Sequence, residues 1–312
     1  KDFKEIKGDA SFRKFYRNTK KNSIIVFANK EKTKNLLIYD SINKILIKND
    51  IIAPQLLSQN YKKNYIEIQD LGNKTIYQIF SNYKKKQYPI FKKAINVLNK
   101  IQLVKDKKIK NFKNEFYLIK DYKNKILLDE ANLFSHWYVP KKLDKKKINI
   151  FKTKFNREIK LLLSKLHFKN DTFVHRDFHV SNLIINSKNQ IGLIDNQDAL
   201  IGNKAYDLAS LIDDVRYKTP NSLKDKVFNY YLKTNKTIDV NKFKNDFDIL
   251  SVLRNLKIIG IFMRLAERDK KRKYLKLIPY AWNMIDSRMS ENKELKNLKL
   301  LLATNFPKFI TK

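Results

Sequence analysis

The sequence predicts an α+β protein with two lobes, a small β-rich N-terminal lobe and a large, mostly helical C-terminal lobe. Short apolar or alternating stretches, which are typical of strands, dominate residues 1–70. Helical spacing of apolar residues dominates residues 71–312, and a single β-hairpin interrupts it. We therefore expect two domains with these boundaries.

The N-terminal lobe is predicted to contain two strands, one helix and a third strand, in that order. Residues 12–18 alternate partly and are rich in aromatic side chains, and residues 23–28 form a compact apolar run, so both favour strands. Residues 34–48 carry apolar side chains at the spacing of one helix face, and residues 64–69 favour the third strand. Gly72 follows this strand, and we expect a hinge there.

The C-terminal lobe is predicted to be a series of helices with one hairpin among them. The two short strands of this hairpin, at 183–185 and 190–194, flank a Ser-Lys-Asn turn. The predicted helices cover residues 89–104, 154–168, 205–217, 222–234, 242–268, 272–288 and 291–303.

Composition excludes several kinds of site. The chain has no Cys, which excludes disulfides, thiolate metal sites and thiol nucleophiles. It has five Gly and neither of the usual Gly-rich phosphate loops, G-x-G-x-x-G or G-x-x-x-x-G-K-[ST]. No apolar run approaches the roughly 20 residues that span a bilayer, and no signal-peptide pattern opens the chain. We expect a cytoplasmic protein without a membrane partner.

The formal net charge is +36, from 67 Lys and Arg against 31 Asp and Glu. Such a balance is typical of proteins that bind nucleic acid or anionic membranes. Lys is spread along the whole chain, however, and Arg is scarce, so we interpret the charge as compositional bias and expect no nucleic-acid partner. Residues 171–216 break this pattern with seven acids and four bases. The acids indicate cation binding and proton handling, and the alternative is a cluster of helix caps and surface acids.

The motif H-R-D-F-H-V-S-N at 175–182 is the strongest chemical signal in the chain, and Ile-Asp follows it at 194–195. The hairpin between them is expected to bring Asn182 and Asp195 face to face. One amide oxygen and one carboxylate form a hard-oxygen site that suits Mg²⁺. Asp177 is then available as a base or orienting group for an attacking hydroxyl, which completes the minimal equipment for phosphoryl transfer.

This motif resembles the catalytic loop of the aminoglycoside phosphotransferase and choline kinase group, which shares the protein-kinase-like fold. Further blocks resemble a bacterial subgroup, the anomeric sugar kinases that act on N-acetylmuramate and N-acetylglucosamine in cell-wall recycling. These blocks are Gly8–Arg17, Glu67–Gly72, Leu133–Tyr138, Asp195–Ala199, Tyr206–Leu211 and Arg254–Gly260. They cover nearly the whole chain in the right order, so the resemblance implies a two-lobed kinase-like fold that uses ATP and Mg²⁺.

The resemblance also implies roles for individual residues. Asp177 corresponds to the catalytic base, and Asn182 and Asp195 correspond to the metal ligands. The first lobe would bind ATP through Gly8, Asp9, Ala10, Ser11, Arg13, Arg17, Glu67 and Asp70. The candidates for substrate contact, each with a structural role as the alternative, are His179, Asp198, Trp137 and Tyr138. His175 and Asp207 are expected to support the catalytic loop.

Three features depart from the wider kinase pattern. Residues 23–28 offer no Lys for the ATP phosphates, and the helix at 34–48 has no Glu to pair with one. The candidates for the missing cation are Arg13, Arg17 and Lys30. Asn196 stands where relatives usually have Phe, directly after the predicted metal ligand.

The expected activity is ATP-dependent phosphorylation of the anomeric hydroxyl of an amino sugar. The first alternative is another small hydroxyl acceptor, namely an aminoglycoside, choline or homoserine. The others are a metallohydrolase built on His175, Asp177 and His179, and an inactive kinase-like module that binds nucleic acid. The chain begins at Lys1 rather than Met, which is compatible with a further domain fused upstream.

Overall fold

The computed structural model describes residues 2–6, 13–29, 34–82 and 87–310. The chain divides into two units, and each is built from two separate segments. The first unit contains Lys1–Lys120 and Thr172–Ile201, and the second contains Asp121–Asp171 and Gly202–Lys312. The domain boundary expected between residues 70 and 71 stays a prediction.

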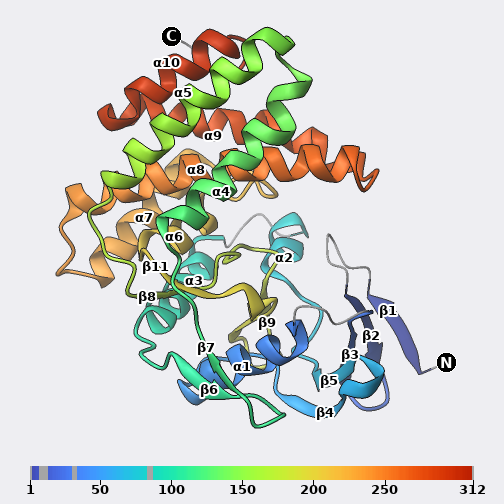
Figure 1. The fold of residues 1–312 in the computed structure, drawn as a ribbon. Helices are drawn as coiled ribbons and strands as arrows, with labels where there is room; N and C mark the ends of the chain where they lie inside the picture. Colours follow the sequence, from blue (N-terminus) through green and yellow to red (C-terminus); the bar gives the residue numbers. More distant parts are fainter. Residues whose placement is uncertain (1, 7–12, 30–33, 83–86, 311–312) are drawn as a thin grey trace. The chain divides into compact units, whose positions relative to one another are not determined.

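The first unit is built on a five-stranded antiparallel sheet (Figure 1). In chain order its strands are β1 (Phe3–Ile6), β2 (Lys14–Asn18), β3 (Ser23–Phe27), β4 (Leu56–Asn60) and β5 (Tyr65–Gln69). They lie in the order β1-β2-β3-β5-β4, and every neighbouring pair is antiparallel. The β2–β3 turn is tight because Asn22 takes a left-handed conformation with φ of 48° and the Asn18 side chain accepts two backbone N–H groups.

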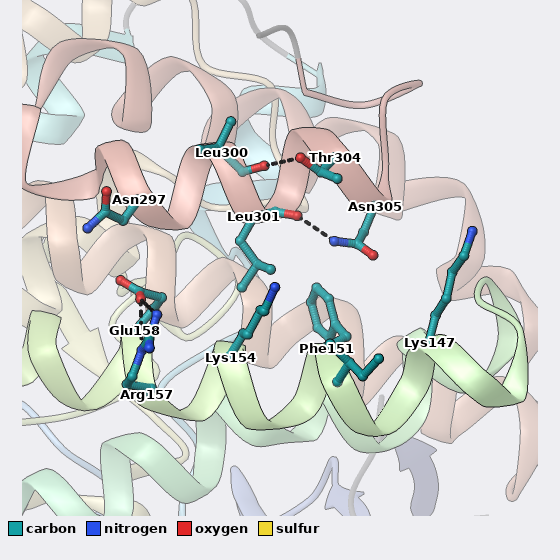
Figure 2. Close-up of a pocket in the computed structure, with 11 residues that line it drawn as sticks. Lys147, Phe151, Lys154, Arg157, Glu158, Asn297, Leu300, Leu301, Thr304 and Asn305 are labelled. Atoms are coloured by element: carbon teal, nitrogen blue, oxygen red, sulfur yellow. Dashed lines mark hydrogen bonds and ion pairs between the residues drawn. The ribbon is translucent and has the colours of Figure 1, made fainter.

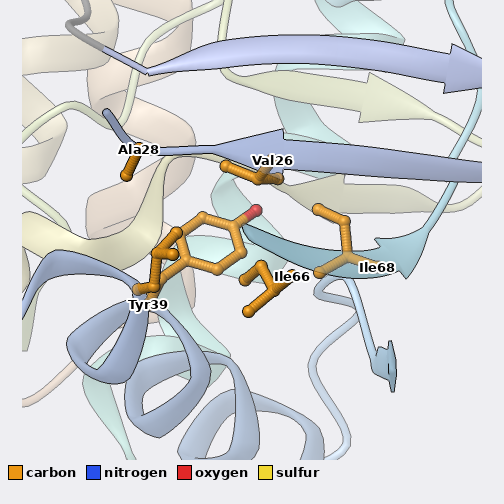
Figure 3. Close-up of a cluster of buried hydrophobic side chains, with 6 residues drawn as sticks. Val26, Ala28, Tyr39, Ile66 and Ile68 are labelled. Carbon is orange, nitrogen blue, oxygen red and sulfur yellow. The ribbon is translucent and has the colours of Figure 1, made fainter. Parts of the chain in front are cut away.

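Helix α1 (Asn35–Lys48) packs against this sheet and forms its core (Figure 3). The cluster joins α1 to β3 and β5 through Val26, Ala28, Leu36, Tyr39, Ile66 and Ile68. Val26 pairs with Ile66 across the two strands, so both side chains lie on the same face of the sheet. Each large side chain buried in this way contributes about 1.5–3 kcal/mol to stability.

The rest of the first unit consists of further helices and strand pairs. They are η1 (Tyr61–Lys63), α2 (Ile76–Asn82), α3 (Gln87–Gln102), β6 (Lys108–Lys110), β7 (Phe116–Leu118), β8 (Thr172–Val174), β9 (Leu183–Ile185), β10 (Ile191–Leu193) and η4 (Asn196–Asp198). β6 pairs with β7, β9 with β10, and β8 with β11 (Leu200–Gly202). Backbone hydrogen bonds tie the second segment to the first: Ile185 N–H donates to the Lys74 carbonyl at 2.9 Å and Leu193 N–H to the Ile52 carbonyl at 2.8 Å.

The second unit is helical. Its elements are α4 (Asn124–Leu133), η2 (Phe134–Tyr138), η3 (Val139–Lys141), α5 (Lys145–Ser164), α6 (Ala205–Ile212), α7 (Asn221–Thr234), α8 (Val240–Glu267), η5 (Arg272–Leu277), α9 (Ile278–Glu291), η6 (Lys293–Leu295) and α10 (Lys296–Asn305). The 28-residue helix α8 contacts α4, α6 and α9 (Figure 1). None of the helices in the described ranges is both long enough and apolar enough to cross a membrane.

Gly260 lets α8 approach the junction of α4 and η2 closely. A Cβ atom at this position would lie 2.3 Å from the backbone carbonyl carbon of Leu133. We expect Gly260→Ala to lower the free energy of unfolding by about 2 kcal/mol, because overpacking by even one methyl group typically costs about 1–3 kcal/mol. This loss exceeds the gain of up to about 1 kcal/mol that Ala brings to a helix interior.

Urea denaturation measures this difference, and Lys226→Ala on the exposed face of α7 is the control. The control should change stability by less than about 0.5 kcal/mol. An unfolding midpoint for Gly260→Ala equal to that of the wild type would contradict the close approach.

The structure confirms the predicted α+β class and corrects several helix ends. α5 begins at Lys145 instead of 154, and α6 ends at Ile212 instead of 217. The helix predicted over 272–288 starts as a 3₁₀ segment, η5, and continues as α9. β1, β4, α2 and α4 lack a clear sequence pattern and are found only in the structure.

Candidate active site

The β9–β10 hairpin places the backbone of Asn182 opposite Ile194, next to Asp195 in the chain. β9 and β10 pair antiparallel with Leu183 opposite Leu193. One residue further out, the Ile194 N–H donates to the Asn182 carbonyl at 3.1 Å. The side chains of Asn182 and Asp195 therefore emerge at the same end of the hairpin.

The loop between β8 and β9 is held by hydrogen bonds to its own backbone. The Asp177 N–H donates to His175 Nδ1 at 3.3 Å, and the Asp177 carbonyl accepts from the Asn182 side-chain amide at 3.1 Å. Arg176 has φ of 72°, which turns the chain sharply just before Asp177. The backbone of Asp177 is thus fixed from both sides, and its side chain is half-buried. These contacts agree with the supporting role predicted for His175.

The oxygens of Asn182 and Asp195 suit a magnesium ion. The Asn182 amide nitrogen is engaged, while its Oδ1 accepts no hydrogen bond within the described ranges. Asp195 Oδ1 accepts from Arg13 and Gln197, and Asp195 Oδ2 has no partner in the part of the chain that the structure describes. One amide and one carboxylate oxygen are hard donors, and Mg²⁺ usually completes its octahedron with phosphate oxygens and water. The donor set therefore fits the predicted metal.

Arg13 supplies a cation beside these ligands. Its side chain is 4% exposed. Its NH2 group lies 2.5 Å from Asp195 Oδ1, and its NH1 group donates to Gln197 Oε1 at 2.9 Å. The guanidinium also lies over the rings of Phe15 and Tyr39, 5.5 and 5.7 Å from their centroids. Among the three candidates for the missing cation, Arg13 contacts a predicted metal ligand directly.

Tyr39 keeps a neutral ring under this guanidinium. Burial raises the pKa of the Tyr39 hydroxyl to about 12, although the nearby Arg13 charge acts in the opposite direction. The ring therefore stays uncharged at any physiological pH. It offers a π-face that holds Arg13 in place without competing for Asp195.

Arg17 and Asp70 form an ion pair at the predicted hinge. Arg17 Nε and NH2 donate to the two carboxylate oxygens of Asp70 at 2.5 and 3.1 Å, and NH2 also donates to the Gly72 carbonyl. The Gly72 N–H donates back to Asp70 Oδ1 at 2.8 Å, and Gly72 has φ of 108°, which favours glycine. A bidentate pair of this kind fixes the chain after β5.

Of the other residues predicted to bind ATP, Glu67 is hydrogen-bonded within the sheet, and the rest lie outside the described residues. The Glu67 carboxylate on β5 accepts from the Ser23 and Ser58 hydroxyls, and the hydrogen bond from Ser23 lowers the pKa of Glu67. The predicted phosphate turn lies outside the described residues, and it comprises Gly8, Asp9, Ala10 and Ser11. Lys30, the third candidate cation, lies outside them as well.

Two substrate candidates lie on the first unit. His179 is buried, and its Nε2 lies 3.5 Å from the Asn182 amide nitrogen, which favours a structural role. Asp198 is exposed, and its carboxylate accepts from Gln197 at 2.9 Å. Arg176 donates to the Asp198 backbone carbonyl at 3.1 Å.

Three further candidates lie on the second unit. Tyr138 is 1% exposed, and its hydroxyl accepts from Trp282 Nε1 at 3.3 Å, so its ring belongs to the core and cannot stack on a sugar. Burial raises the pKa of Tyr138. Trp137 is half-buried and is kept as the candidate for stacking. Asp207 is buried in the first turn of α6.

A groove between α5 and α10 is also part of the second unit (Figure 2). Its lining combines basic, apolar and amide side chains, among them Lys147, Phe151, Lys154, Arg157, Leu301 and Asn305. Among the described residues, none of those predicted for catalysis, metal binding or ATP binding lines it. We therefore assign it no part in the candidate active site.

The fold is that of small-molecule kinases with a protein-kinase-like architecture. It is similar to a choline/ethanolamine kinase family protein from Mesorhizobium loti, with a TM-score of 0.64 at 11% identity, covering 97% of this chain and 92% of that one. It is also similar to a spectinomycin phosphotransferase in complex with ADP and spectinomycin, with a TM-score of 0.59 at 17% identity, covering 92% and 90%.

The profile of the phosphotransferase enzyme family matches residues 2–239, and the chain belongs to this family. It is 27% identical over 302 residues to an N-acetylmuramate/N-acetylglucosamine kinase of Pseudomonas putida, covering 95% of this chain and 86% of the relative. It is 28% identical over 306 residues to the enzyme of the same name from Neisseria meningitidis, covering 95% and 88%. These findings confirm the resemblance that the sequence motifs indicate.

Proposed function

We propose that this protein is an ATP-dependent kinase that phosphorylates the anomeric hydroxyl of an amino sugar of the N-acetylmuramate or N-acetylglucosamine type. The observation that carries the proposal is the similarity along 95% of the chain to kinases named for these sugars. The site on the first unit supports it, because it combines a carboxylate, hard-oxygen ligands and a buried cation. The proposal includes a cytoplasmic location and a place in cell-wall recycling.

In this proposal, the chemistry of transfer depends mostly on positioning and charge neutralisation. The Asp177 carboxylate orients the acceptor hydroxyl and takes its proton as the hydroxyl oxygen bonds to the γ-phosphorus. The bond between that phosphorus and the bridging oxygen breaks, and ADP leaves. Asn182 and Asp195 would hold Mg²⁺, which neutralises phosphate charge when it is bound.

Arg13 is assigned to the ATP phosphates in this scheme. We expect Arg13→Gln to lower kcat/KM for ATP by about 10–100-fold, because a hydrogen bond to a charged group is worth about 1.5–3 kcal/mol. Arg13→Lys should recover only part of this loss, because Lys keeps the charge without the planar fork of donors.

Steady-state kinetics with varied ATP measure the effect of both variants. Arg157→Gln, which removes an exposed guanidinium of the second unit, is the matched control. An unchanged KM and kcat for ATP in Arg13→Gln would leave another residue as the missing cation.

The acceptor is tested directly with a panel of amino sugars, an aminoglycoside, choline and homoserine in the presence of Mg-ATP. Phosphorus NMR of the product locates the new phosphate. We expect an anomeric sugar phosphate, and a product formed only from one of the other acceptors would replace the proposed substrate. Turnover of N-acetylmuramate but not of N-acetylglucosamine would restrict the proposed substrate to N-acetylmuramate.

The two remaining alternatives have less support in the structure. Both ring nitrogens of His175 are hydrogen-bonded within the protein, so this residue is not available as the metal ligand that a hydrolase would need. A nucleic-acid module without activity would bind RNA in a salt-dependent manner and leave ATP unchanged. A further domain fused upstream stays a prediction that the full-length gene tests.

A further inference from the structure

A continuous chain of hydrogen bonds links the catalytic loop to α1 in the interior of the first unit. The Asp177 N–H donates to His175 Nδ1 at 3.3 Å, and His175 Nε2 lies 2.7 Å from Asn196 Oδ1. The Asn196 amide nitrogen donates to Asn43 Oδ1 at 2.8 Å, and the Asn43 amide nitrogen donates to the Pro54 carbonyl at 3.0 Å. We call the side chains of His175, Asn196 and Asn43 the amide relay.

Every bond in the relay runs in the same direction, from the loop outward to Pro54. His175 Nδ1 accepts the Asp177 N–H, so the ring proton is on Nε2, which donates to Asn196. This assignment then fits the orientation of both amides. A chain in which each group donates to the next is cooperatively strengthened in a low-dielectric interior. The relay therefore specifies one tautomer and two amide orientations.

The relay is deeply buried, so a missing hydrogen bond in it would lower the stability of the protein. His175 and Asn196 are 0% exposed and Asn43 is 2% exposed. A buried amide without hydrogen-bond partners lowers the stability of the fold by at least about 1–3 kcal/mol. Three apolar side chains would fill the same space without this risk. Hydrogen bonds fix the orientation of the groups that they join, whereas apolar packing does not. The relay therefore fixes the orientation of each group that it contacts.

The groups that the relay touches surround both predicted reaction residues. Asn196 is bonded to Asp195 in the chain, and its amide also donates to the Leu193 carbonyl at 3.1 Å. His175 Nε2 lies 3.2 Å from the Ile194 carbonyl. Asp195 itself has φ of 65°, a conformation that costs an L-residue roughly 1–2 kcal/mol and needs support from its neighbours. The relay supports the backbone on both sides of Asp195 and at Asp177.

Helix α1 contributes no charged partner to this region. Its one acid, Asp40, is ion-paired with Lys44 of the same helix at 2.9 Å. The link from α1 to the loop is therefore neutral and is carried by Asn43. We propose that Asn43 and Asn196 are positioning residues, which set the placement of Asp177 and Asp195 through His175. This inference rests on the proposed kinase function.

Kinetics of three variants test the proposal. Asn196→Leu and Asn43→Leu each break the relay and remove one hydrogen bond from the buried amide that remains, so both should lose stability and activity. We expect kcat to fall on the order of 10–100-fold, because small misplacements of reacting groups have effects of this size. The KM values for ATP and sugar should stay near those of the wild type, because neither residue contacts a ligand in the proposed scheme.

The double variant Asn43→Leu/Asn196→Leu separates positioning from mere stability. Replacing both partners of a buried hydrogen bond by apolar groups can be nearly neutral for stability. We therefore expect its unfolding midpoint to recover toward that of the wild type while kcat stays low. A kcat that recovers together with the midpoint would overturn the proposal. Asn49→Leu, at the C-cap of the same helix, is the control, because the Asn49 side-chain amide donates to Ile45 and Asp106, which lie outside the relay.

Nitrogen-15 NMR of the His side chains gives a readout that does not depend on the acceptor. The chain has four His, so the His175 ring can be assigned by substitution. We expect the Nε2-protonated tautomer in both proteins, because the Asp177 N–H and the Ile194 carbonyl still contact the ring in Asn196→Leu. The Nε2 resonance should shift in Asn196→Leu, because Nε2 loses the shorter of its two hydrogen bonds. An unchanged Nε2 chemical shift would overturn the proposal. If the wild type phosphorylates none of the acceptors, the proposed function is wrong. The NMR measurement still tests the relay in that case, because it needs no substrate.

Discussion

Asp177→Asn is expected to reduce phosphoryl transfer by about 10²–10⁴-fold, the range that a positioned general base contributes. Asn has the size of Asp and can still accept a hydrogen bond, but it cannot take up the proton of the acceptor hydroxyl. The fold of the loop should survive, because the Asp177 N–H and carbonyl keep their hydrogen bonds to His175 and Asn182 in this variant.

Rapid-mixing kinetics under saturating Mg-ATP and sugar measure the loss, and calorimetry measures nucleotide binding. Binding of ATP should remain close to that of the wild type, because the carboxylate of Asp177 acts on the acceptor in the proposed scheme. Wild-type turnover in Asp177→Asn would remove this residue from the reaction.

Asp195→Asn is expected to reduce the rate of phosphoryl transfer by a similar factor, but with a different dependence on magnesium. A metal ion contributes several kcal/mol of charge stabilisation in such reactions, so we expect a loss on the order of 10²–10³-fold. The variant also removes the charge that faces Arg13 at 2.5 Å. The loss should be partly reversed by raising the Mg²⁺ concentration, whereas the loss in Asp177→Asn should not be.

A magnesium titration of the initial rate distinguishes the two residues. Asp171→Asn is the matched control, since it removes an exposed acid from the same acidic stretch of the sequence. An unaltered magnesium dependence in Asp195→Asn would show that the metal ligands lie elsewhere.

The centre of the sheet could be predicted from the sequence, whereas its edges could not. β3 and β5 bury Val26, Ile66 and Ile68, and β2 carries two half-buried aromatic side chains, so these three strands leave an apolar or alternating pattern. β1 and β4 are the edge strands, and all of their residues are exposed or half-buried, so no pattern distinguishes them from loops. Pairing with a neighbour, which is not a local property, makes them strands.

Some residues of the candidate site could likewise be predicted from the sequence, and others could not. Asp177, Asn182 and Asp195 belong to one local motif and could be found from their spacing. Gln197 and Asn43 could not, because their partners are 184 and 153 residues away in the chain. Asn43 did leave one signal, since it is a polar residue at a buried position of α1, as are Asp40 and Ser41.

The acidic stretch has two different explanations in the structure. Asp177 and Asp195 belong to the candidate active site, as the interpretation of cation binding requires. Asp213 is instead a buried structural acid, which accepts from Lys224 Nζ at 2.8 Å and from Arg288 Nε at 2.9 Å. Burial alone raises the pKa of Asp213, but the charges of Arg288 and Lys224 hold that pKa well below its usual range. A charge count cannot separate these two roles.

The two-segment construction of the first unit has a consequence for how the protein is made. The ribosome finishes Lys1–Lys120 long before Thr172–Ile201, which supplies the strands β8, β9 and β10. At about 5–20 residues per second, synthesis from residue 120 to residue 201 takes roughly 4–16 s. During that interval the nascent sheet lacks the hairpin that ties back to Ile52 and Lys74. The first unit therefore completes its fold only after α4 and α5 of the second unit have been synthesised.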